Sequence, residues 1–463
     1  MSARTCIICG GPTGSREHIF PAALGGRRTN KGIYCGDHNE AYSGLAGIIT
    51  EQLAFFNAQL GVVGDHADKP TSVTMTDVAS GQKIEMRDGQ VRFKSPQTRS
   101  EKTADGQTVT EMAFSNQKEA EDWVREQKAK GVDVKIISMG SKARYHPGTG
   151  HKQIKLGGDE EGLRAIGYIA QTFLAHAFPD IARLPALQGI KDYTLNNVGT
   201  GFVWWDFEPP AKLPPNAFPF GHRVIVGLNG EDGTAYARIS FFSTLNFAIL
   251  LGTVPLVTSR TVITDIDPLA QSPPNDIVTL TEDAAVGAVR RPDVLSASLA
   301  EAIRSGQAES QVRELMRRIT DFKRQAIAAS IMARIAGAAA LPDAERNALF
   351  DNIVSTEAQR VLNLMCHVAN DLKERASNPV ENAMATFMEQ ATALDPAAEN
   401  GLSEEATRSL AVACEALAKQ MSEDCKAGRL DQDRMEMLIG GGPGAAVVGT
   451  ALAEKFALRF PDR

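Results

Sequence analysis

Several features that would assign this 463-residue chain to a class at once are scarce or missing. It has six cysteines, and three of them are scattered through the C-terminal part, so we expect no disulfide framework. The formal net charge is −7, so any nucleic-acid site has to be a local basic patch on an acidic body. The most apolar run, residues 245–257, is interrupted by Asn, Gly and Pro and is shorter than the roughly 20 residues of a membrane-spanning helix. We expect no membrane contact and, since no apolar stretch precedes Cys6 as a secretory signal, a cytoplasmic protein.

The composition and the pattern of hydrophobic residues indicate an α+β protein. Apolar residues make up 43% of the chain and charged residues 23%, as in soluble globular proteins, and the length suggests about two to four domains. We expect a mixed α/β middle region and a mainly α-helical C-terminal region, because alternating, strand-like segments follow residue 70 and Ala-rich helical patterns dominate near the end. The expected domains are an N-terminal module at 1–60, a β-rich domain with one helix at 61–155, an α+β domain at 156–290 and a helical domain at 291–463.

Local signals predict individual elements. The spacing of apolar residues predicts a helix that begins near Asn39 and an amphipathic helix capped by Asp159. Asp-Gly at 88–89 and the segment NGEDG at 229–233 predict the turns of two β-hairpins. The apolar run at 245–257 predicts a buried strand or a core helix.

The segment CIICGGPTGSREHIFPAALGGRRTNKGIYCGDHN, residues 6–39, contains half of the cysteines. Cys6 and Cys9 have the spacing of a zinc knuckle, and Cys35 and His38 repeat that spacing 26 residues later. Three thiolates and one imidazole predict a closed structural zinc site, and so short a segment would owe much of its stability to the metal. In an alternative assignment, His38 takes part in catalysis and the zinc keeps three protein ligands, but the two-residue gap favours the zinc role.

The residues between the two pairs carry a further pattern. They include REHIFPAALGG at 16–26 and then Asn30, while Asn39 directly follows the last expected zinc ligand. This order resembles the HNH endonuclease family, in particular its variants whose core is held by two zinc pairs, over roughly the first 55 residues. The resemblance implies a ββα-metal fold and a nuclease. Two positions depart from the family, because the second pair ends in His38 instead of Cys and the last catalytic position is Asn39 instead of His.

The resemblance implies a role for each polar residue of the segment. His18 would act as the base that activates water, because neutral imidazole accepts a proton near pH 7. Glu17 and Asn39 would hold a catalytic Mg²⁺ or Mn²⁺ through oxygen atoms. Neighbours on a strand point to opposite faces, so the backbone would have to bend at Glu17. Asn30 would brace the loop by hydrogen bonds to the backbone and so orient His18.

Basic residues near these positions predict where a nucleic acid would lie. Arg27, Arg28 and Lys31 lie between His18 and Cys35 and would meet phosphates, with an ordinary solvated basic loop as the alternative. A second stretch, residues 141–155, holds four Lys or Arg and no acid. It would extend the nucleic-acid track or form another solvated loop.

The sequence therefore predicts a metal-dependent endonuclease that hydrolyses DNA phosphodiester bonds. In the family that it resembles, modules joined to long extra domains often serve restriction or phage defence, which implies antiviral defence by analogy. The alternatives are a zinc-stabilised nucleic-acid-binding module without catalysis and a scaffold or interaction protein. The Ala-rich helices after residue 291 suggest a homo-oligomer formed through the C-terminal region.

Overall fold

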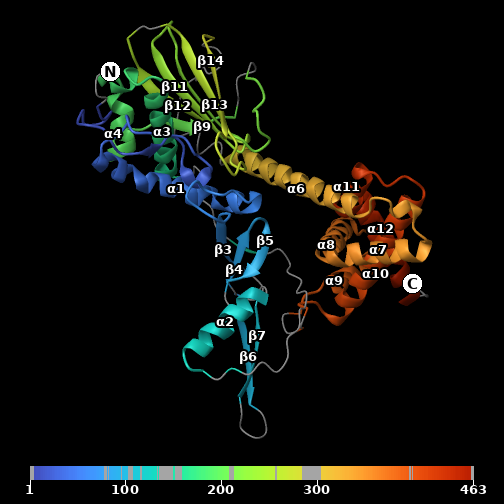
Figure 1. The fold of residues 1–463 in the computed structure, drawn as a ribbon. Coiled ribbons are helices and arrows are strands. Elements are labelled where there is room, and N and C mark those ends of the chain that lie inside the picture. Colours follow the sequence, from blue (N-terminus) through green and yellow to red (C-terminus); the bar gives the residue numbers. More distant parts are fainter. Residues whose placement is uncertain are drawn as a thin grey trace. The chain divides into compact units, whose positions relative to one another are not determined.

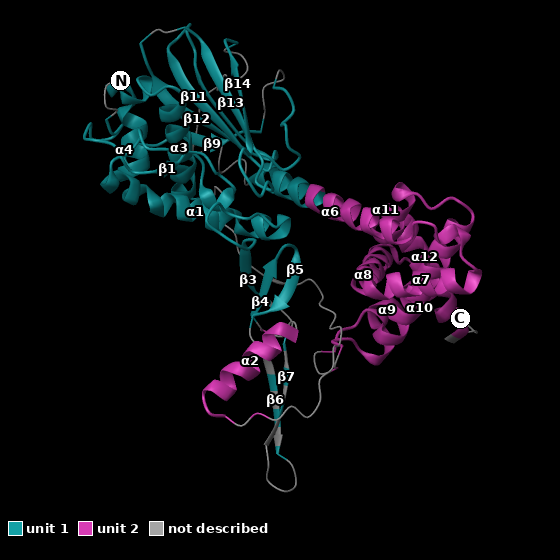
Figure 2. Ribbon diagram, viewed as in Figure 1, with its two compact units in different colours: residues 1–76, 83–115, 151–317 teal, residues 77–82, 116–150, 318–463 magenta. Residues whose placement is uncertain are grey.

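The computed structural model divides the chain into two compact units (Figure 2). Unit 1 consists of residues 1–76, 83–115 and 151–317, and unit 2 of residues 77–82, 116–150 and 318–463. The residues that the structure describes are 5–77, 81, 83–94, 96–102, 108–114, 117–132, 134, 150–151, 159–207, 213–255, 258–283, 304–395, 398 and 400–459. The chain thus has a mixed α/β fold, as expected.

Unit 1 is built around a six-stranded antiparallel sheet with the strand order β14-β13-β10-β11-β12-β9 (Figure 1). Its strands are β9 (Val203–Trp205), β10 (His222–Leu228), β11 (Thr234–Phe241), β12 (Leu245–Thr253), β13 (Arg260–Ile266) and β14 (Asp276–Thr281). The hairpin predicted at 229–233 joins β10 to β11 and is confirmed. The apolar run forms a strand, β12, which is largely buried because it lies inside the sheet between β11 and β9.

Helix α3 (Glu160–Ala177) packs against both this sheet and helix α1 (Gly36–Leu60), and helix α4 (Gln188–Asn196) lies beside it (Figure 1). The predicted cap of α3 is confirmed, because the Asp159 carboxylate accepts a hydrogen bond of 2.8 Å from the backbone N–H of Gly162. Almost every residue of α3 after this first turn is buried, whereas the sequence predicted one apolar face. Packing on two sides explains the difference, because a helix covered by two layers has little surface left for solvent.

The N-terminal segment forms a short hairpin followed by a long helix. Strands β1 (Glu17–His18) and β2 (Thr29–Asn30) pair antiparallel, and α1 follows them. The helix begins at Gly36, one turn before the expected start at Asn39. It ends at Leu60, and the C-cap residue Gly61 adopts the left-handed conformation that glycine tolerates best.

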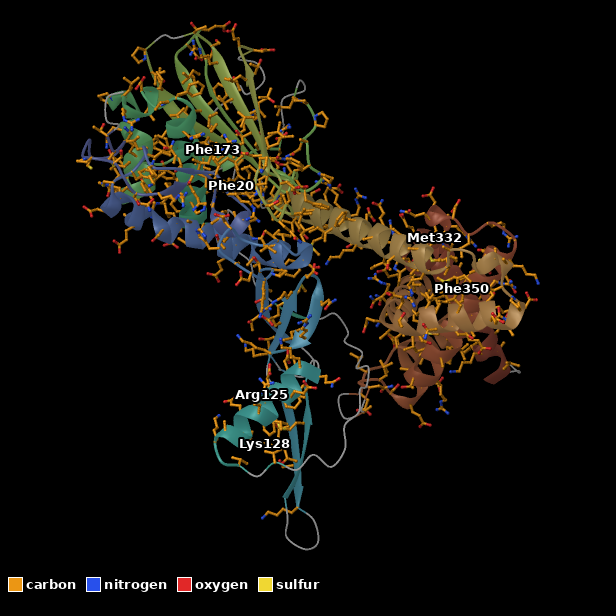
Figure 3. All side chains as sticks on the ribbon, in the orientation of Figure 1. Phe20, Arg125, Lys128, Phe173, Met332 and Phe350 are labelled. Carbon is orange, nitrogen blue, oxygen red and sulfur yellow. The ribbon has the colours of Figure 1, made fainter. Side chains whose placement is uncertain are left out.

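The first 60 residues form no unit of their own, because their aromatic side chains pack against the rest of unit 1. Phe20, two residues after β1, contacts Phe173 of α3, with 6.3 Å between ring centroids (Figure 3). Tyr42 of α1 stacks on Tyr168 of α3 at 4.9 Å. The predicted N-terminal module therefore shares one core with the six-stranded sheet.

Smaller elements follow α1. One four-stranded sheet has the order β5-β4-β3-β8, and β6 and β7 form a separate pair. The elements here are β3 (Ser72–Asp77), β4 (Lys83–Arg87), β5 (Gln90–Phe93), β6 (Gln97–Lys102), β7 (Thr108–Ala113), β8 (Gly150–His151) and helix α2 (Gln117–Ala129). The predicted hairpin turn at Asp88-Gly89 is confirmed, with positive φ angles of 49° and 65°. The basic stretch at 141–155 lies outside the described residues except for 150–151.

Unit 2 is mainly α-helical, which confirms the expectation for the C-terminal region. Its core includes Phe350, and Met332 packs against it (Figure 3). The helices are α6 (Gln307–Arg334), which begins in unit 1, α7 (Asp343–Thr356), α8 (Ala358–Arg375), α9 (Pro379–Ala391), α10 (Glu404–Lys426), α11 (Gln432–Gly440) and α12 (Gly442–Arg459). Within the described ranges, no single helix has the length and apolar content to cross a membrane, and α11 and α12 reach both only as a pair bent by 51°.

Candidate metal centre and histidine site

The four residues predicted to bind zinc come together at one end of α1. Cys6 and Cys9 lie on a turn closed by a 3.0 Å hydrogen bond from the Gly10 N–H to the Cys6 carbonyl. Cys35 is the N-cap residue of α1, and His38 follows in its first turn. The ligand atoms of the four residues all lie within 4.8 Å of one another. A loop and a helix start therefore bring together two candidate ligands each.

The distances in this cluster match a tetrahedral metal site. Cys9 Sγ lies 3.9 Å from Cys35 Sγ, and His38 Nδ1 lies 3.8 Å from Cys6 Sγ and 3.1 Å from Cys35 Sγ. Zn–S bonds of about 2.3 Å and Zn–N bonds of about 2.0 Å place two sulfurs about 3.8 Å apart, and sulfur and nitrogen about 3.5 Å apart. Because the observed separations fall around these values, the cluster can hold a structural metal ion.

The surroundings of Cys6 favour its thiolate form, which is the form that metals bind. Burial raises its pKa, but backbone N–H groups of Cys9, Cys35 and Ile8 donate toward the sulfur, and the net pKa is lowered. Cys6 is also almost fully buried, whereas Cys9 is exposed. The cluster thus lies at the surface with one ligand anchored in the core.

His18 meets an acidic partner that the sequence did not suggest. Its Nε2 lies 3.0 Å from Oδ2 of Asp65, which follows α1 by five residues. The Arg27 guanidinium donates to the other oxygen, Oδ1, at 3.2 Å. The hydrogen bond from His18 lowers the pKa of Asp65, burial acts in the opposite direction, and Arg27 lowers it further. Asp65 is therefore a carboxylate near neutral pH, held between two basic side chains.

A second histidine completes this group. His66 Nδ1 lies 4.0 Å from Asp65 Oδ2, and the His18 and His66 rings meet edge-on with 5.1 Å between centroids. The side chain of His18 is 16% exposed and that of His66 is 75% exposed, so the group opens to solvent. The ligand atoms of His18, Asp65 and His66 all lie within 4.8 Å of one another, which makes a second arrangement that can hold a metal ion. Sequence reasoning missed Asp65 and His66, although this Asp-His pair directly after a helix repeats the acid-His order of residues 17–18.

Glu17 lies on the other side of β1 from His18. Its side chain is buried, and the Tyr168 hydroxyl of α3 donates a hydrogen bond to its Oε1. Burial raises the pKa of Glu17 to about 7, although the hydrogen bond from Tyr168 lowers it. The pairing of β1 with β2 is regular, with Glu17 opposite Asn30, so the backbone bend that ion binding at Glu17 requires is not present. Glu17 therefore contacts the core instead of the surface around His18.

The two asparagines differ in their surroundings. Asn30 braces its loop as expected, because its Oδ1 accepts a 2.8 Å hydrogen bond from the Gly32 N–H. Its Nδ2 lies 3.0 Å from Nδ1 of His176 on α3, so this side chain links β2 to the core. In the described part of the chain, the buried Oδ1 of Asn39 has no hydrogen-bond partner. An unpaired buried oxygen marks Asn39 as a group with unused binding capacity.

The three basic residues of the loop are not equivalent. The Arg27 side chain is only 7% exposed and also donates to the Ala270 carbonyl at 2.9 Å, so it acts inside the protein. Arg28 is 42% exposed and forms an ion pair of 2.8 Å with Asp276. Lys31 is exposed. The surface available to phosphates therefore consists of Lys31 and the partly exposed Arg28, and Arg27 instead holds Asp65.

Searches of the chain against protein-family models, curated proteins and solved structures give no match. The functional assignment therefore depends on the residues themselves. They provide a cluster of four residues that can hold a metal ion and, on the β1–β2 hairpin beside α1, a partly exposed imidazole hydrogen-bonded to a carboxylate.

Proposed function

We propose that the chain is a metal-dependent endonuclease that hydrolyses DNA phosphodiester bonds at His18. The observation that carries the proposal is the position of this imidazole, partly exposed on a β1–β2 hairpin next to α1 and hydrogen-bonded to Asp65. The order of two short strands and a helix, with Cys-x-x-Cys before it and Cys-x-x-His at the helix start, supports the resemblance to HNH endonucleases. The four-ligand cluster would hold zinc and fix the hairpin to the helix.

The chemistry of the site fits this reaction. Hydrolysis of a phosphodiester needs a group that accepts a proton from water and positive charge near the phosphate. Asp65 at Nε2 holds the ring of His18 and leaves Nδ1 as the nitrogen with a free lone pair. A divalent ion would supply positive charge against the charge that develops on the phosphate. Glu17 does not fit as a ligand of that ion, because it is buried and bonded to Tyr168.

DNA is the proposed partner, and Lys31, directly after β2, is an exposed basic residue of this hairpin. In the family that the chain resembles, nuclease modules with long extra domains often serve restriction or phage defence. By that analogy, the remaining seven-eighths of the chain would recognise a target, a signal or a second copy of the chain through its helical region.

The test is cleavage of supercoiled plasmid by the full chain with Mg²⁺ or Mn²⁺, compared with His18→Ala. We expect nicked or linear DNA from the wild type and a loss of about 10²–10⁴-fold in the variant, the range for removal of a general base. His367→Ala is the matched control, because this exposed histidine lies on α8 in unit 2. Zinc content has to be equal in all three proteins. Cleavage that persists in His18→Ala would overturn the assignment of the site.

The engagement of Glu17 by Tyr168 favours one second candidate, a zinc-stabilised nucleic-acid-binding module without catalysis. In that case the protein binds DNA with a strong dependence on salt, and no divalent ion supports cleavage. Fluorescence anisotropy with a labelled duplex at low salt separates the two candidates from a scaffold protein, which would not bind the duplex at all.

A further inference from the structure

The group formed by His18, Asp65 and His66 has the composition of a cation site. It combines two imidazole nitrogens and one carboxylate oxygen from two segments of chain, the β1–β2 hairpin and the loop after α1. The closest pair of ligand atoms, His18 Nε2 and Asp65 Oδ2, is 3.0 Å apart. Two ligands at about 2.1 Å from one ion lie about 3.0 Å apart when they meet it at right angles, so this pair already has the separation that an ion needs.

We propose that His18, Asp65 and His66 bind a divalent first-row transition-metal ion, with Mn²⁺ as the probe. Two imidazoles suit ions such as Fe²⁺, Ni²⁺ and Zn²⁺, and the carboxylate also suits Mn²⁺, whereas Mg²⁺ prefers oxygen ligands and retains most of its water. His66 Nδ1, at 4.0 Å from Asp65 Oδ2, needs to move closer, and its 75% exposed side chain is free to do so. With three protein ligands and a solvent-exposed side, the site retains open positions for water or a phosphate oxygen.

The carboxylate of this site is positioned by its surroundings. Arg27 holds Oδ1 at 3.2 Å and leaves Oδ2 toward the two histidines. The backbone N–H of Asp65 donates a 3.1 Å hydrogen bond to the Ala22 carbonyl, which fixes the loop. Gly64 permits this close approach, because a Cβ there would lie 3.2 Å from the same oxygen. Outer partners of this kind orient a metal ligand, so Arg27 is a positioning residue.

This inference rests on the proposed function for the role of the ion in hydrolysis. The binding experiment that tests it does not depend on that function. The resemblance implies an ion between Glu17 and Asn39, whereas the observed geometry places the accessible ligands on the opposite side of β1. In the site that we propose, His18 Nε2 binds the ion in place of its hydrogen bond to Asp65, so His18 changes from the base of the proposed function to a ligand, and His18→Ala is expected to lose cleavage in either role. Arg28 lies across the hairpin from this site, since its carbonyl accepts a 3.1 Å hydrogen bond from the Ile19 N–H.

The experiment is a titration of the untagged full chain, loaded with one zinc per molecule, with Mn²⁺. The loss of the free Mn²⁺ signal in electron paramagnetic resonance measures binding directly, and Mn²⁺ competes poorly for the thiolates of the zinc cluster. We expect one Mn²⁺ per chain and a loss of affinity of at least about 10-fold in His66→Ala and in Asp65→Asn, since even outer partners contribute about 10–100-fold. His66 is exposed, so its variant retains the fold. Asp68→Asn is the control, because it removes the same charge from an exposed residue of the same loop.

The outcomes separate the site from the activity. Loss of Mn²⁺ binding in His66→Ala but not in Asp68→Asn supports the site, whether or not the protein cleaves DNA. No binding by the wild type, or equal binding by all variants, overturns it. Binding that is lost in Glu17→Gln and retained in His66→Ala overturns it as well and places the ion where the resemblance implies. Plasmid cleavage without any Mn²⁺ bound at His66 would retain the proposed function and reject this inference.

Discussion

The buried carboxyl of Glu17 should make the stability of unit 1 fall as the pH rises. Burial raises the pKa of this group from 4.5 to about 7. Between these values the folded protein retains a proton that the unfolded chain releases, so the folded state binds more protons and the free energy of unfolding decreases with pH. One pH unit of such a difference corresponds to about 1.4 kcal/mol, so the decrease is about 3 kcal/mol, complete just above pH 7.

Glu17→Gln isolates this contribution. The amide has the size of the protonated acid and accepts the same hydrogen bond from Tyr168, but it does not titrate. Urea unfolding of zinc-loaded wild type and variant should therefore give a stability difference that grows by roughly 2–3 kcal/mol in favour of the variant between pH 5 and pH 8. Subtraction of the two curves cancels other titrating groups, including the zinc ligands. Tyr168→Phe should extend the pH range over which the free energy of unfolding decreases to higher pH, because it removes the hydrogen bond that lowers the pKa of Glu17.

Two results would contradict this reasoning. If the difference between wild type and Glu17→Gln does not change with pH, Glu17 is not a buried protonated acid. If Mg²⁺ or Mn²⁺ also stabilises the wild type at pH 8 and leaves Glu17→Gln unaffected, the carboxylate binds the ion. The backbone of β1 would then have to rearrange from the geometry described above.

Two further predictions concern the metal cluster and the loop beside it. Cys35→Ser should reduce bound zinc from about one per chain to near zero after dialysis and make unit 1 sensitive to protease. Cys414→Ser in unit 2 is the control and should retain the metal. Zinc retained in Cys35→Ser would contradict the ligand set. Gly26→Ala should lower the melting temperature, because its Cβ would lie 2.1 Å from the Phe20 carbonyl oxygen and such overpacking typically costs about 1–3 kcal/mol. Gly14→Ala is the matched control, because a Cβ there meets nothing within 4 Å, and equal melting of the two variants would show that the backbone near Phe20 gives way.

Elements that depend on nearby residues could be predicted from the sequence. The Asp159 cap, the Asp88-Gly89 turn and the helical C-terminal region each follow from residues a few positions apart. What could not be predicted depends on partners far along the chain. The sequence left strand and helix open for the run at 245–257, because only pairing with β11 and β9 makes it a strand. The same holds for the first 60 residues, whose burial requires α3 and the sheet.

In the candidate site, too, features set by nearby residues could be predicted, and features set by distant partners could not. The spacing of the two Cys/His pairs was sufficient to predict that four candidate ligands meet, because each pair lies within one turn of backbone. Asp65 lies 47 residues after His18, so no local pattern connects the two. Arg27 was predicted to meet phosphates because a sequence shows its charge but not its burial. The structure gives its guanidinium a carboxylate partner in the interior.

The alternation of side chains along β1 decides where an ion can bind. The cluster of Cys6, Cys9, Cys35 and His38 brings both ends of the segment together, since Cys6 and Cys9 precede the hairpin and Cys35 follows it. Between these anchors, β1 and β2 pair in regular register, and two neighbours on a paired strand point to opposite faces. Glu17 is the neighbour that points inward, because Tyr168 offers it a hydrogen bond that the apolar core around it does not. His18 must then point outward, and an ion that His18 binds has to take its other ligands from the loop after α1. Asp65 and His66 are the residues that this loop provides.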